Sequence, residues 1–390
     1  MNNHHHHHFF LICFPAQGHL NPTLQLAKHL IDAGATVTFA TTVHGLRQLK
    51  TFPSLEGLFY ASFSDGFDDG INPTNCPSNI ISEIKRVSSQ TLTDLIQRHS
   101  DEHRQVTCLI YSLTMQWAAE VAPQVGIPTA FFCVHVFESF GSEPPNSVQL
   151  QGLPPFASTE LPSFLLPTSP YASIIPSFKE QNWTLEKDPN PCVILNTFAA
   201  LEGDAIKAVA SLNSIALGPL IPSVLFNGKG GQSDASSFQC QLFESSTNDY
   251  LNWPNSKLDH SVAYVSFGSM VTMQRKQTEE ILHGLIDSGR PFLWVIRSSE
   301  PKMKGQEPVD RDVVIYERQV GGGGVKAGVD EEGVVRREEI KSCLEIVMGG
   351  GEKREEITRN VKKWKSLALQ AVEEGGSSHN DFKLFMEKLR

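Results

Sequence analysis

The sequence contains no long hydrophobic run, since no apolar stretch approaches the ~18 residues that a membrane-spanning helix requires. Its first residues lack the basic segment and the small-residue cleavage site of a secretory signal. Basic residues are also in the minority: 33 Lys and Arg face 43 Asp and Glu, so the net charge of −10 disfavours a nucleic-acid or anionic-membrane partner. These absences predict a cytoplasmic protein with no integral membrane association.

Disulfide and metal patterns are missing as well. The seven cysteines are odd in number, show no CxxC pairing and partly lie in apolar runs, which is typical of reduced, buried thiols. No GxSxG or HExxH signature occurs, and the glycine-rich stretches at 228–233 and 321–328 match neither a P-loop nor a dinucleotide fingerprint. The histidines at 4–8 could bind a metal, but a tag or a disordered start fits their composition better, so we predict no metal site.

Apolar runs alternate with amphipathic stretches throughout the first half of the chain. The runs that we predict as strands are 9–14, 36–42, 59–64, 107–112, 129–134, 192–198 and 215–219. Helices are predicted from Asn21, with Pro22 at the first helical position and Gly34 after the end, and from Ser78 to His99. Such alternation predicts an α/β fold with a parallel, doubly wound sheet.

The second half restarts this pattern and then breaks it. Two apolar runs, 261–269 and 291–297, flank a predicted helix at 274–286, and 312–316 is a third candidate strand. Farther along the chain only helices are predicted, at 337–348, 352–374 and from 379 onwards. A free-standing doubly wound domain has about five or six strands, so we expect this half to be incomplete.

Two irregular stretches set the expected domain boundaries. The Pro/Ser-rich region 142–170 is predicted to be a surface loop over a cleft, and 225–237 has the composition of a linker. We therefore expect an N-terminal domain at 1–224, a linker at 225–245 and a C-terminal domain at 246–390.

A short motif, PAQGHLNP at 15–22, follows the first predicted strand and contains His19. Open α/β sheets bind ligands beyond the carboxyl ends of their strands, which is where this histidine is expected. Imidazole titrates near neutral pH and can act as a general base. These residues alone favour an ordinary turn or helix-cap histidine slightly, because short motifs produce many false matches.

Three longer stretches resemble plant UDP-dependent glycosyltransferases of family 1. They are FPAQGHLNPTLQLAKHL (14–30), VAYVSFGSM (262–270) followed by PFLWVIR (291–297), and the tail from DEEGVVRREEI to NDFKLF (330–385). Together with LIYSLTMQWAAEVA (109–122) and LPSFLLP (161–167), they are most similar to the subgroup of anthocyanin 5-O-, indole-acetate, abscisate and crocetin glucosyltransferases. The resemblance extends over nearly the whole chain.

The resemblance implies a GT-B fold of two facing Rossmann-like domains, with the acceptor in the N-terminal domain and the sugar donor in the C-terminal domain. It implies inverting transfer of glucose from UDP-glucose, as co-substrate, to a hydroxyl or carboxyl of a small plant metabolite. The implied acceptors are a flavonoid, an anthocyanin, a hormone or an apocarotenoid acid. No cofactor is expected, and the protein is expected to be a monomer.

Carried onto this sequence, the resemblance makes His19 the general base. Ser112 stands where many family members have an aspartate that orients the base. A hydroxyl can accept a hydrogen bond from imidazole but cannot neutralise an imidazolium, so we hypothesise acidic acceptors that lose a proton easily; a passive strand-end serine is the alternative. The implied donor-binding residues are Gly18, Gly268 and Ser269, and the implied acceptor-binding residues are Gln17 and His135.

The chain departs from the family in its C-terminal half. The family has a donor-binding box there, with a Trp-x-Gln for the uracil, a His-Cys-Gly-Trp-Asn-Ser segment for the diphosphate and an acidic-Gln pair for the sugar, and none of these occurs between Arg297 and Gly333. The loss corresponds to about two strand–helix–strand units of ~30 residues each. A smaller gap follows 131–141. We therefore expect impaired or absent turnover; the alternative is a non-catalytic remnant that binds a small molecule or a partner.

Overall fold

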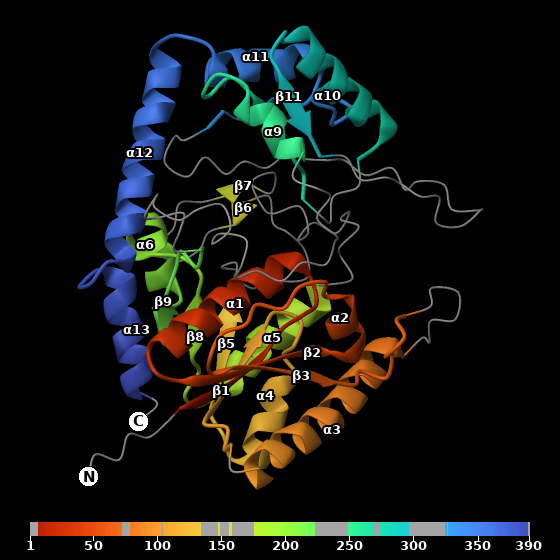
Figure 1. Ribbon diagram of the computed structural model, residues 1–390, viewed down its shortest axis with the longest axis vertical. Helices are drawn as coiled ribbons and strands as arrows, with labels where there is room; N and C mark the ends of the chain where they lie inside the picture. Colours follow the sequence, from red (N-terminus) through yellow and green to blue (C-terminus); the bar gives the residue numbers. More distant parts are fainter. Residues whose placement is uncertain are drawn as a thin grey trace.

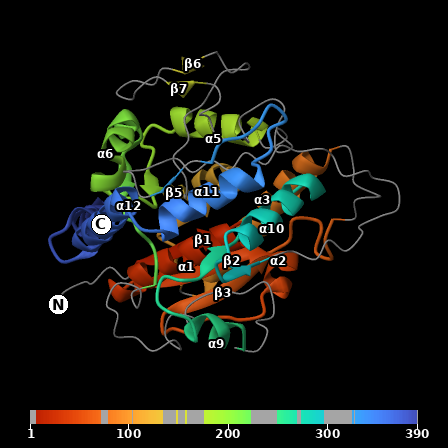
Figure 2. The same cartoon turned by 90° about the horizontal axis from the view of Figure 1, so that it is seen from above.

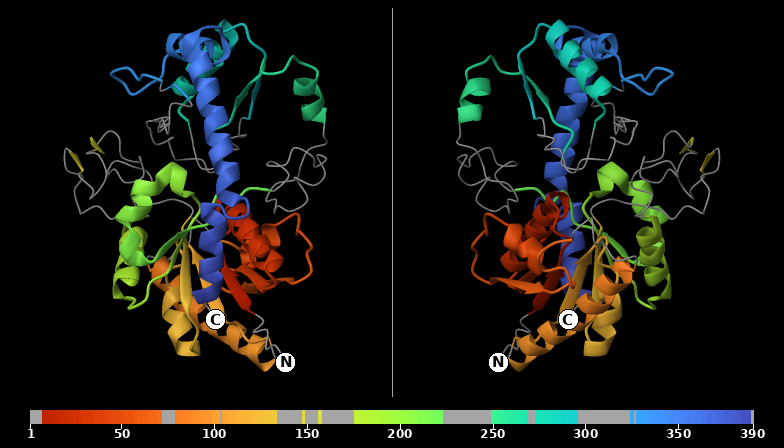
Figure 3. Two further views of the ribbon diagram at one scale, coloured as in Figure 1. Left: turned by 90° about the vertical axis from the view of Figure 1, so that its left-hand side faces the viewer. Right: turned by 90° about the vertical axis from the view of Figure 1, so that its right-hand side faces the viewer.

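The computed structural model describes residues 7–71, 79–102, 104–133, 147–148, 156–157, 175–222, 249–268, 273–295, 324–325 and 327–388. They form two α/β parts, one above the other in Figure 1. The lower part contains the described residues of 7–133, residues 175–222 and helix α13 (Ser377–Lys388), and the upper part contains the described residues between 249 and 348. Helix α12 (Glu352–Val372) runs along one side of both parts (Figure 1, Figure 3).

Seven parallel strands form the sheet of the lower part, in the order β3-β2-β1-β4-β5-β8-β9. Their bounds are β1 (His8–Ile12), β2 (Thr36–Thr42), β3 (Leu58–Phe63), β4 (Cys108–Ser112), β5 (Thr129–Cys133), β8 (Val193–Leu195) and β9 (Ser214–Ala216). The prediction of a parallel, doubly wound α/β sheet is confirmed, and each predicted strand of this half occurs close to its expected position.

Helices cover both faces of this sheet. They are α1 (Gln17–Asp32), α2 (Val43–Gln48), α3 (Ile80–Asp101), α4 (Ala118–Val121), α5 (Ile175–Lys187) and α6 (Ala199–Ala208). All five side chains of β1 are buried, as expected for a central parallel strand. Phe9 and Leu11 join an apolar cluster with residues of α1, whereas Phe10 and Ile12 join a cluster with residues of α3, α4 and α5.

The structure corrects our interpretation of the histidine run at its last two residues. His7 and His8 are 8% and 3% exposed, and His8 is the first residue of β1. The ring of His8 makes two hydrogen bonds, one joining Nδ1 to the carbonyl oxygen of Arg104 (3.0 Å) and one joining Nε2 to Oγ1 of Thr38 (2.8 Å). Their composition favours a tag or a disordered start, but both residues are buried at the beginning of the central strand β1.

The start of α1 is also corrected. We predicted a helix from Asn21, but α1 begins at Gln17 and contains Pro22 inside it. The reason is that the backbone N–H groups of His19 and Leu20 both donate to the carbonyl oxygen of Ala16, at 2.8 and 2.9 Å, so the first turn closes before the proline. Pro22 then costs the helix a single backbone hydrogen bond. His19 consequently lies in the first helical turn.

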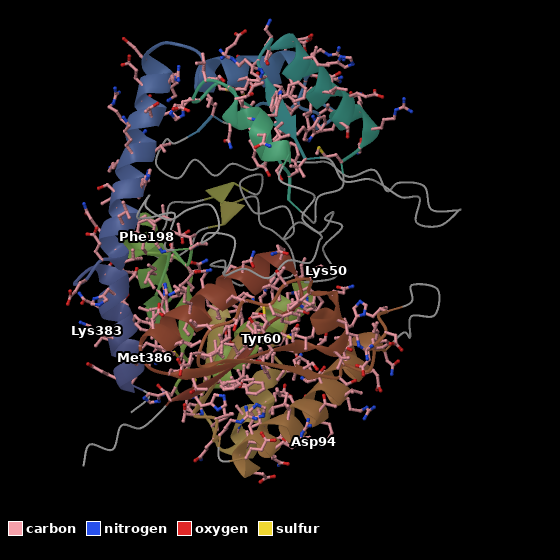
Figure 4. The ribbon with its side chains drawn as sticks, in the orientation of Figure 1. Lys50, Tyr60, Asp94, Phe198, Lys383 and Met386 are labelled. Atoms are coloured by element: carbon pink, nitrogen blue, oxygen red, sulfur yellow. The ribbon has the colours of Figure 1, made fainter. Side chains whose placement is uncertain are left out.

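The terminal helix α13 returns to the lower part. Phe385 is 1% exposed and stacks on Phe9 of β1, with ring centroids 6.1 Å apart, and the hydroxyl of Ser378 donates to the carbonyl oxygen of Gly218 (2.6 Å). Figure 4 labels Met386, which packs against the same apolar cluster, and the exposed Lys383. The core of the first sheet therefore includes residues from near the end of the chain.

The upper part contains a pair of parallel strands among its described residues, β10 (Ala263–Val265) and β11 (Phe292–Trp294). The helices around them are α9 (Asp249–Asn255), α10 (Arg275–Asp287) and α11 (Arg337–Met348). The candidate strand at 312–316 and the predicted linker lie outside the described residues, as does the loop at 142–170 apart from a short antiparallel pair, β6 (Ser147–Val148) and β7 (Phe156–Ala157). In the part of the chain that the structure describes, no helix is long and apolar enough to cross a membrane.

Helices α10 and α11 lie side by side (Figure 2) and are held by two sets of polar contacts. The side-chain amide of Gln277 donates to the carbonyl oxygen of Val335 (3.0 Å) and accepts from its N–H (2.9 Å). The carboxylate of Glu280 accepts from the backbone N–H of Arg337 (2.8 Å) and from its guanidinium (2.7 Å). Chain segments on either side of residues 296–323 are thus joined directly.

We expect Glu280→Gln to lower the unfolding free energy by about 1–2 kcal/mol at pH 7, because the ion pair with Arg337 becomes a weaker hydrogen bond between the guanidinium and a neutral amide. The hydrogen bonds from Arg337 lower the pKa of Glu280 from 4.5 to about 2. A carboxyl whose pKa is lower in the folded state contributes stability above its unfolded pKa, and this contribution is lost as the pH falls through the folded value. The difference between the two proteins should therefore shrink by about half between pH 7 and pH 3.

Chemical denaturation at several pH values measures this difference. Glu279→Gln is the matched control, since Glu279 is half-exposed and its partner Arg275 is almost fully exposed, so a change within about 0.5 kcal/mol is expected. Equal effects of the two substitutions, or a pH-independent effect of Glu280→Gln, would contradict the role given to the Glu280–Arg337 pair.

Candidate functional site at the carboxyl edge of the sheet

The order of the strands places a crevice between β1 and β4. From β1 the chain proceeds to β2 and β3 on one side, and β4 then returns to the other side of β1. This reversal is the point at which open parallel sheets bind ligands, beyond the carboxyl ends of the strands. Two residues predicted from the sequence as catalytic lie at these strand ends. Ser112 is the last residue of β4, and His19 lies in α1, the helix that follows β1.

His19 lies in the first turn of α1, and its backbone is fixed. Its carbonyl oxygen accepts a hydrogen bond from the hydroxyl of Thr23 (2.8 Å), one turn farther along α1. Its half-buried ring packs against the ring of Phe14, with centroids 5.7 Å apart and planes inclined by 70°. The adjacent Gly18 is exposed and has open space where a side chain would project. The half-buried imidazole therefore has an open position beside it, at Gly18.

Ser112 is the last residue of β4 and is 1% exposed. Its hydroxyl oxygen accepts a hydrogen bond from the backbone N–H of Phe14 (3.1 Å). The sequence predicts that this hydroxyl accepts a hydrogen bond from the imidazole of His19. In the structure it accepts one from the backbone of Phe14, whose ring contacts the imidazole. The ends of β1 and β4 are joined by this hydrogen bond.

The remaining predicted site residues are divided among the parts of the molecule. Gln17 and Gly18 are the first two residues of α1, beside His19. Gly268 follows β10 in the upper part, with a positive φ of 69° that favours glycine, and its N–H donates to Oγ of Ser266 (3.4 Å). Ser269 and His135 lie outside the described residues.

Thr114 is a residue that the sequence did not single out. It occupies a turn directly after β4, closed by a hydrogen bond from the N–H of Met115 to the carbonyl oxygen of Ser112 (3.1 Å). Its φ of 71° is rare for a β-branched residue, and its hydroxyl is buried without a hydrogen-bond partner. This turn could not be predicted from the sequence, because a positive φ at that position is usually indicated by glycine or asparagine.

The electrostatics of the crevice favour an anionic or polar ligand. The first turn of α1 contains no acidic residue, and the N-terminus of a 16-residue helix carries a partial positive charge. All five described cysteines carry thiol groups, and burial raises the pKa of Cys192 to about 11 and also raises that of Cys108, so these two thiols are poor nucleophiles. The described residues include no cluster of three or more His, Cys, Asp or Glu that could hold a metal ion.

Comparisons with known proteins agree on one family. Residues 231–316 match the family described as UDP-glucoronosyl and UDP-glucosyl transferase. UDP-glycosyltransferase 75C1 of Solanum lycopersicum is 39% identical over 96% of this chain and 97% of its own length, and the chloroplastic crocetin glucosyltransferase of Gardenia jasminoides is 37% identical over 97% and 96%. The tomato alignment runs over 458 positions, more than the 390 residues of this chain, so that relative carries residues with no counterpart here.

The fold is shared with a solved structure. The crystal structure of Os79 from O. sativa in complex with UDP matches with a TM-score of 0.82, covering 98% of this chain and 100% of that chain at 24% identity. The GT-B architecture implied by the sequence resemblance is thereby confirmed, and the crocetin relative belongs to the subgroup that the sequence motifs indicated.

Proposed function

Because this chain belongs to the plant family of UDP-glucosyltransferases, which use a UDP-sugar as co-substrate, we propose that its N-terminal domain holds a small plant metabolite and that His19 acts as the general base. In such a transfer the acceptor O–H gives its proton to the imidazole. The acceptor oxygen then bonds to C1 of glucose as the bond from C1 to the diphosphate oxygen breaks and UDP leaves. Inversion at C1 follows from this single displacement.

The observation that supports this role is the position of His19. It stands at the point where the strand order reverses, at the start of α1 and next to an open space over Gly18. A base must lie within hydrogen-bond reach of the acceptor oxygen, and this crevice is where an open α/β sheet receives its ligand. Gln17 beside it, and His135, are proposed to contact the acceptor.

The acceptor class follows from the relatives. The sequence resemblance implies a flavonoid, anthocyanin, hormone or apocarotenoid-acid acceptor, and the Gardenia protein, named a crocetin glucosyltransferase, supports the last of these. We propose 1–224 as the acceptor-binding domain, 225–245 as the linker and 246–390 as the donor-binding domain, with α13 packed on the first sheet and the chain acting as a monomer.

The donor side carries the second half of the proposal. Gly18, Gly268 and Ser269 are proposed to approach the diphosphate, but the family's groups for uracil, ribose and sugar do not occur in this sequence. The residues of the tomato relative that have no counterpart here support a deletion in this chain, and the missing motifs place it between Arg297 and Gly333 in our proposal. We propose that turnover is low for lack of donor contacts. The second candidate is a binding protein that retains the complete lower sheet without transfer activity.

Isothermal titration of the full chain with UDP tests the donor side. We expect no binding tighter than about 1 mM, which corresponds to about −4 kcal/mol, because the contacts that would exceed this value are missing. The tomato relative, titrated under the same conditions, is the positive control. Micromolar binding of UDP by this chain would overturn the proposal of an impaired donor site.

A further inference from the structure

Phe14 is an aromatic residue in an unusual place. It follows a strand whose five side chains are all buried, yet its own side chain is 39% exposed at the crevice between β1 and β4. Its ring packs against the ring of His19 at 5.7 Å between centroids. The planes are inclined by 70°, and an aromatic ring in such an edge-to-face pair can hold the orientation of an imidazole. Where the face of the phenyl ring is turned toward the imidazole, it also attracts an imidazolium electrostatically.

Both peptide groups of Phe14 are anchored. Its N–H donates to Oγ of Ser112 (3.1 Å), and its carbonyl oxygen accepts from the N–H of Ala16 (2.8 Å) and from the thiol of Cys13 (3.3 Å). Cys13 is in turn joined to β2, because its N–H donates to the carbonyl oxygen of Ala40 (3.0 Å). The backbone that carries the ring of Phe14 is therefore held by hydrogen bonds to β4, to the residue before α1 and, through Cys13, to β2.

Among the residues that the structure describes, the elements packed around this turn carry few charged side chains. Neither β1 nor β4 contains an acidic residue, and the first turn of α1 contains none. Helix α2 packs on the turn, where Gly45 leaves room for Pro15. It carries His44 and Arg47, which hydrogen-bond with Gln48 and Asp69.

We propose that Phe14 is a positioning residue for His19: its anchored ring sets the orientation of the imidazole and favours the imidazolium that forms when the acceptor gives up its proton. Ser112 contributes to this positioning, because its hydroxyl accepts the hydrogen bond from the N–H of Phe14. The inference rests on the proposed role of His19 as the base, and it assigns to an aromatic ring part of the task that an aspartate performs in other family members. The N-terminus of α1 opposes the charged imidazole, so the ring offsets a cost that the helix imposes.

NMR titration of the full chain, with histidine labelled at Cε1, tests this proposal without sugar transfer. The His19 resonance is assigned by its loss in His19→Asn. We expect Phe14→Leu to lower the titration midpoint of this resonance by about half a pH unit, because a cation–π contact favours the protonated form. Phe14→Trp should preserve the midpoint, and Ser112→Ala should lower it by a smaller amount.

Phe52→Leu is the matched control. Phe52 is 46% exposed and packs its ring edge-on against Tyr60, away from His19, so its replacement should leave the His19 midpoint unchanged. A midpoint that is the same in Phe14→Leu and in the parent chain, with circular dichroism showing both folded, would overturn the proposal. A different result would contradict the proposed function. It is a chain into which the donor-binding box has been inserted and which keeps its transfer activity when His19 is replaced.

Discussion

Inserting a donor-binding box of the family between Arg297 and Gly333, where we propose that it has been lost, should raise glucose transfer by at least about 10³-fold over the intact chain. Each group that stabilises developing charge on the leaving group contributes about 10²–10³ in rate, and the family's donor box supplies several such groups. The described part of the N-terminal domain already places His19 in the first turn of α1, so the insertion tests the donor side alone. Initial rates with UDP-glucose and a phenolic or carboxylic acceptor, followed by product chromatography, measure the effect.

The restored chain also tests the base directly. His19→Ala in that background should reduce kcat by about 10²–10⁴-fold, since this is the usual contribution of a general base. His283→Ala is the control, because His283 is an exposed residue of α10 outside the proposed site, and its replacement should leave the rate unchanged. A restored chain no faster than the parent would contradict the missing-donor explanation, and a fully active His19→Ala variant would contradict the base assignment.

Phe385→Ala should lower the unfolding free energy by about 3–5 kcal/mol, the range found when a buried phenylalanine is truncated in a packed core. Phe385 is 1% exposed, stacks on Phe9 and shares a cluster with Ile215 and Leu217. Removing its ring leaves a cavity between α13 and the first sheet that neighbouring side chains can fill only in part. Thermal and urea-induced unfolding, followed by circular dichroism, measure the loss.

Leu384→Ala is the neighbouring control on the same helix. Leu384 is 54% exposed, so its truncation should change the unfolding free energy by no more than about 0.5 kcal/mol. If both variants unfolded at the same temperature as the parent, α13 would not be docked on the sheet in solution.

The sheet was predictable because its signal is local. A buried parallel strand is a short apolar run bounded by turn residues, and β2, for example, was predicted over its observed bounds. Errors arose where a rule about one residue competed with a contact from another. Pro22 suggested a helix start, but the carbonyl of Ala16 had already accepted the first hydrogen bonds of α1. His8 looked like part of a tag, but strand pairing and two hydrogen bonds place it in the sheet.

The candidate site was predictable only in part. The motif around His19 and the serine at 112 can be found from sequence, because each follows an apolar run and resembles a family pattern. The role of Phe14 could not be found in this way. It depends on the N–H of Phe14 reaching Ser112, 98 residues away, across two neighbouring strands whose adjacency is set by the fold. The positive φ of Thr114 and its buried, unpartnered hydroxyl likewise could not be predicted, because threonine rarely adopts this backbone conformation.

The stacking of Phe385 on Phe9 has a consequence for the order in which the protein is made. A ribosome releases β1 long before it synthesises α13, and N-terminal domains normally fold while the rest of the chain is still being translated. Here one face of the first sheet stays partly uncovered until α13 has left the ribosome. A chain interrupted before residue 377 would therefore expose Phe9 and its neighbours to chaperones or to other nascent chains.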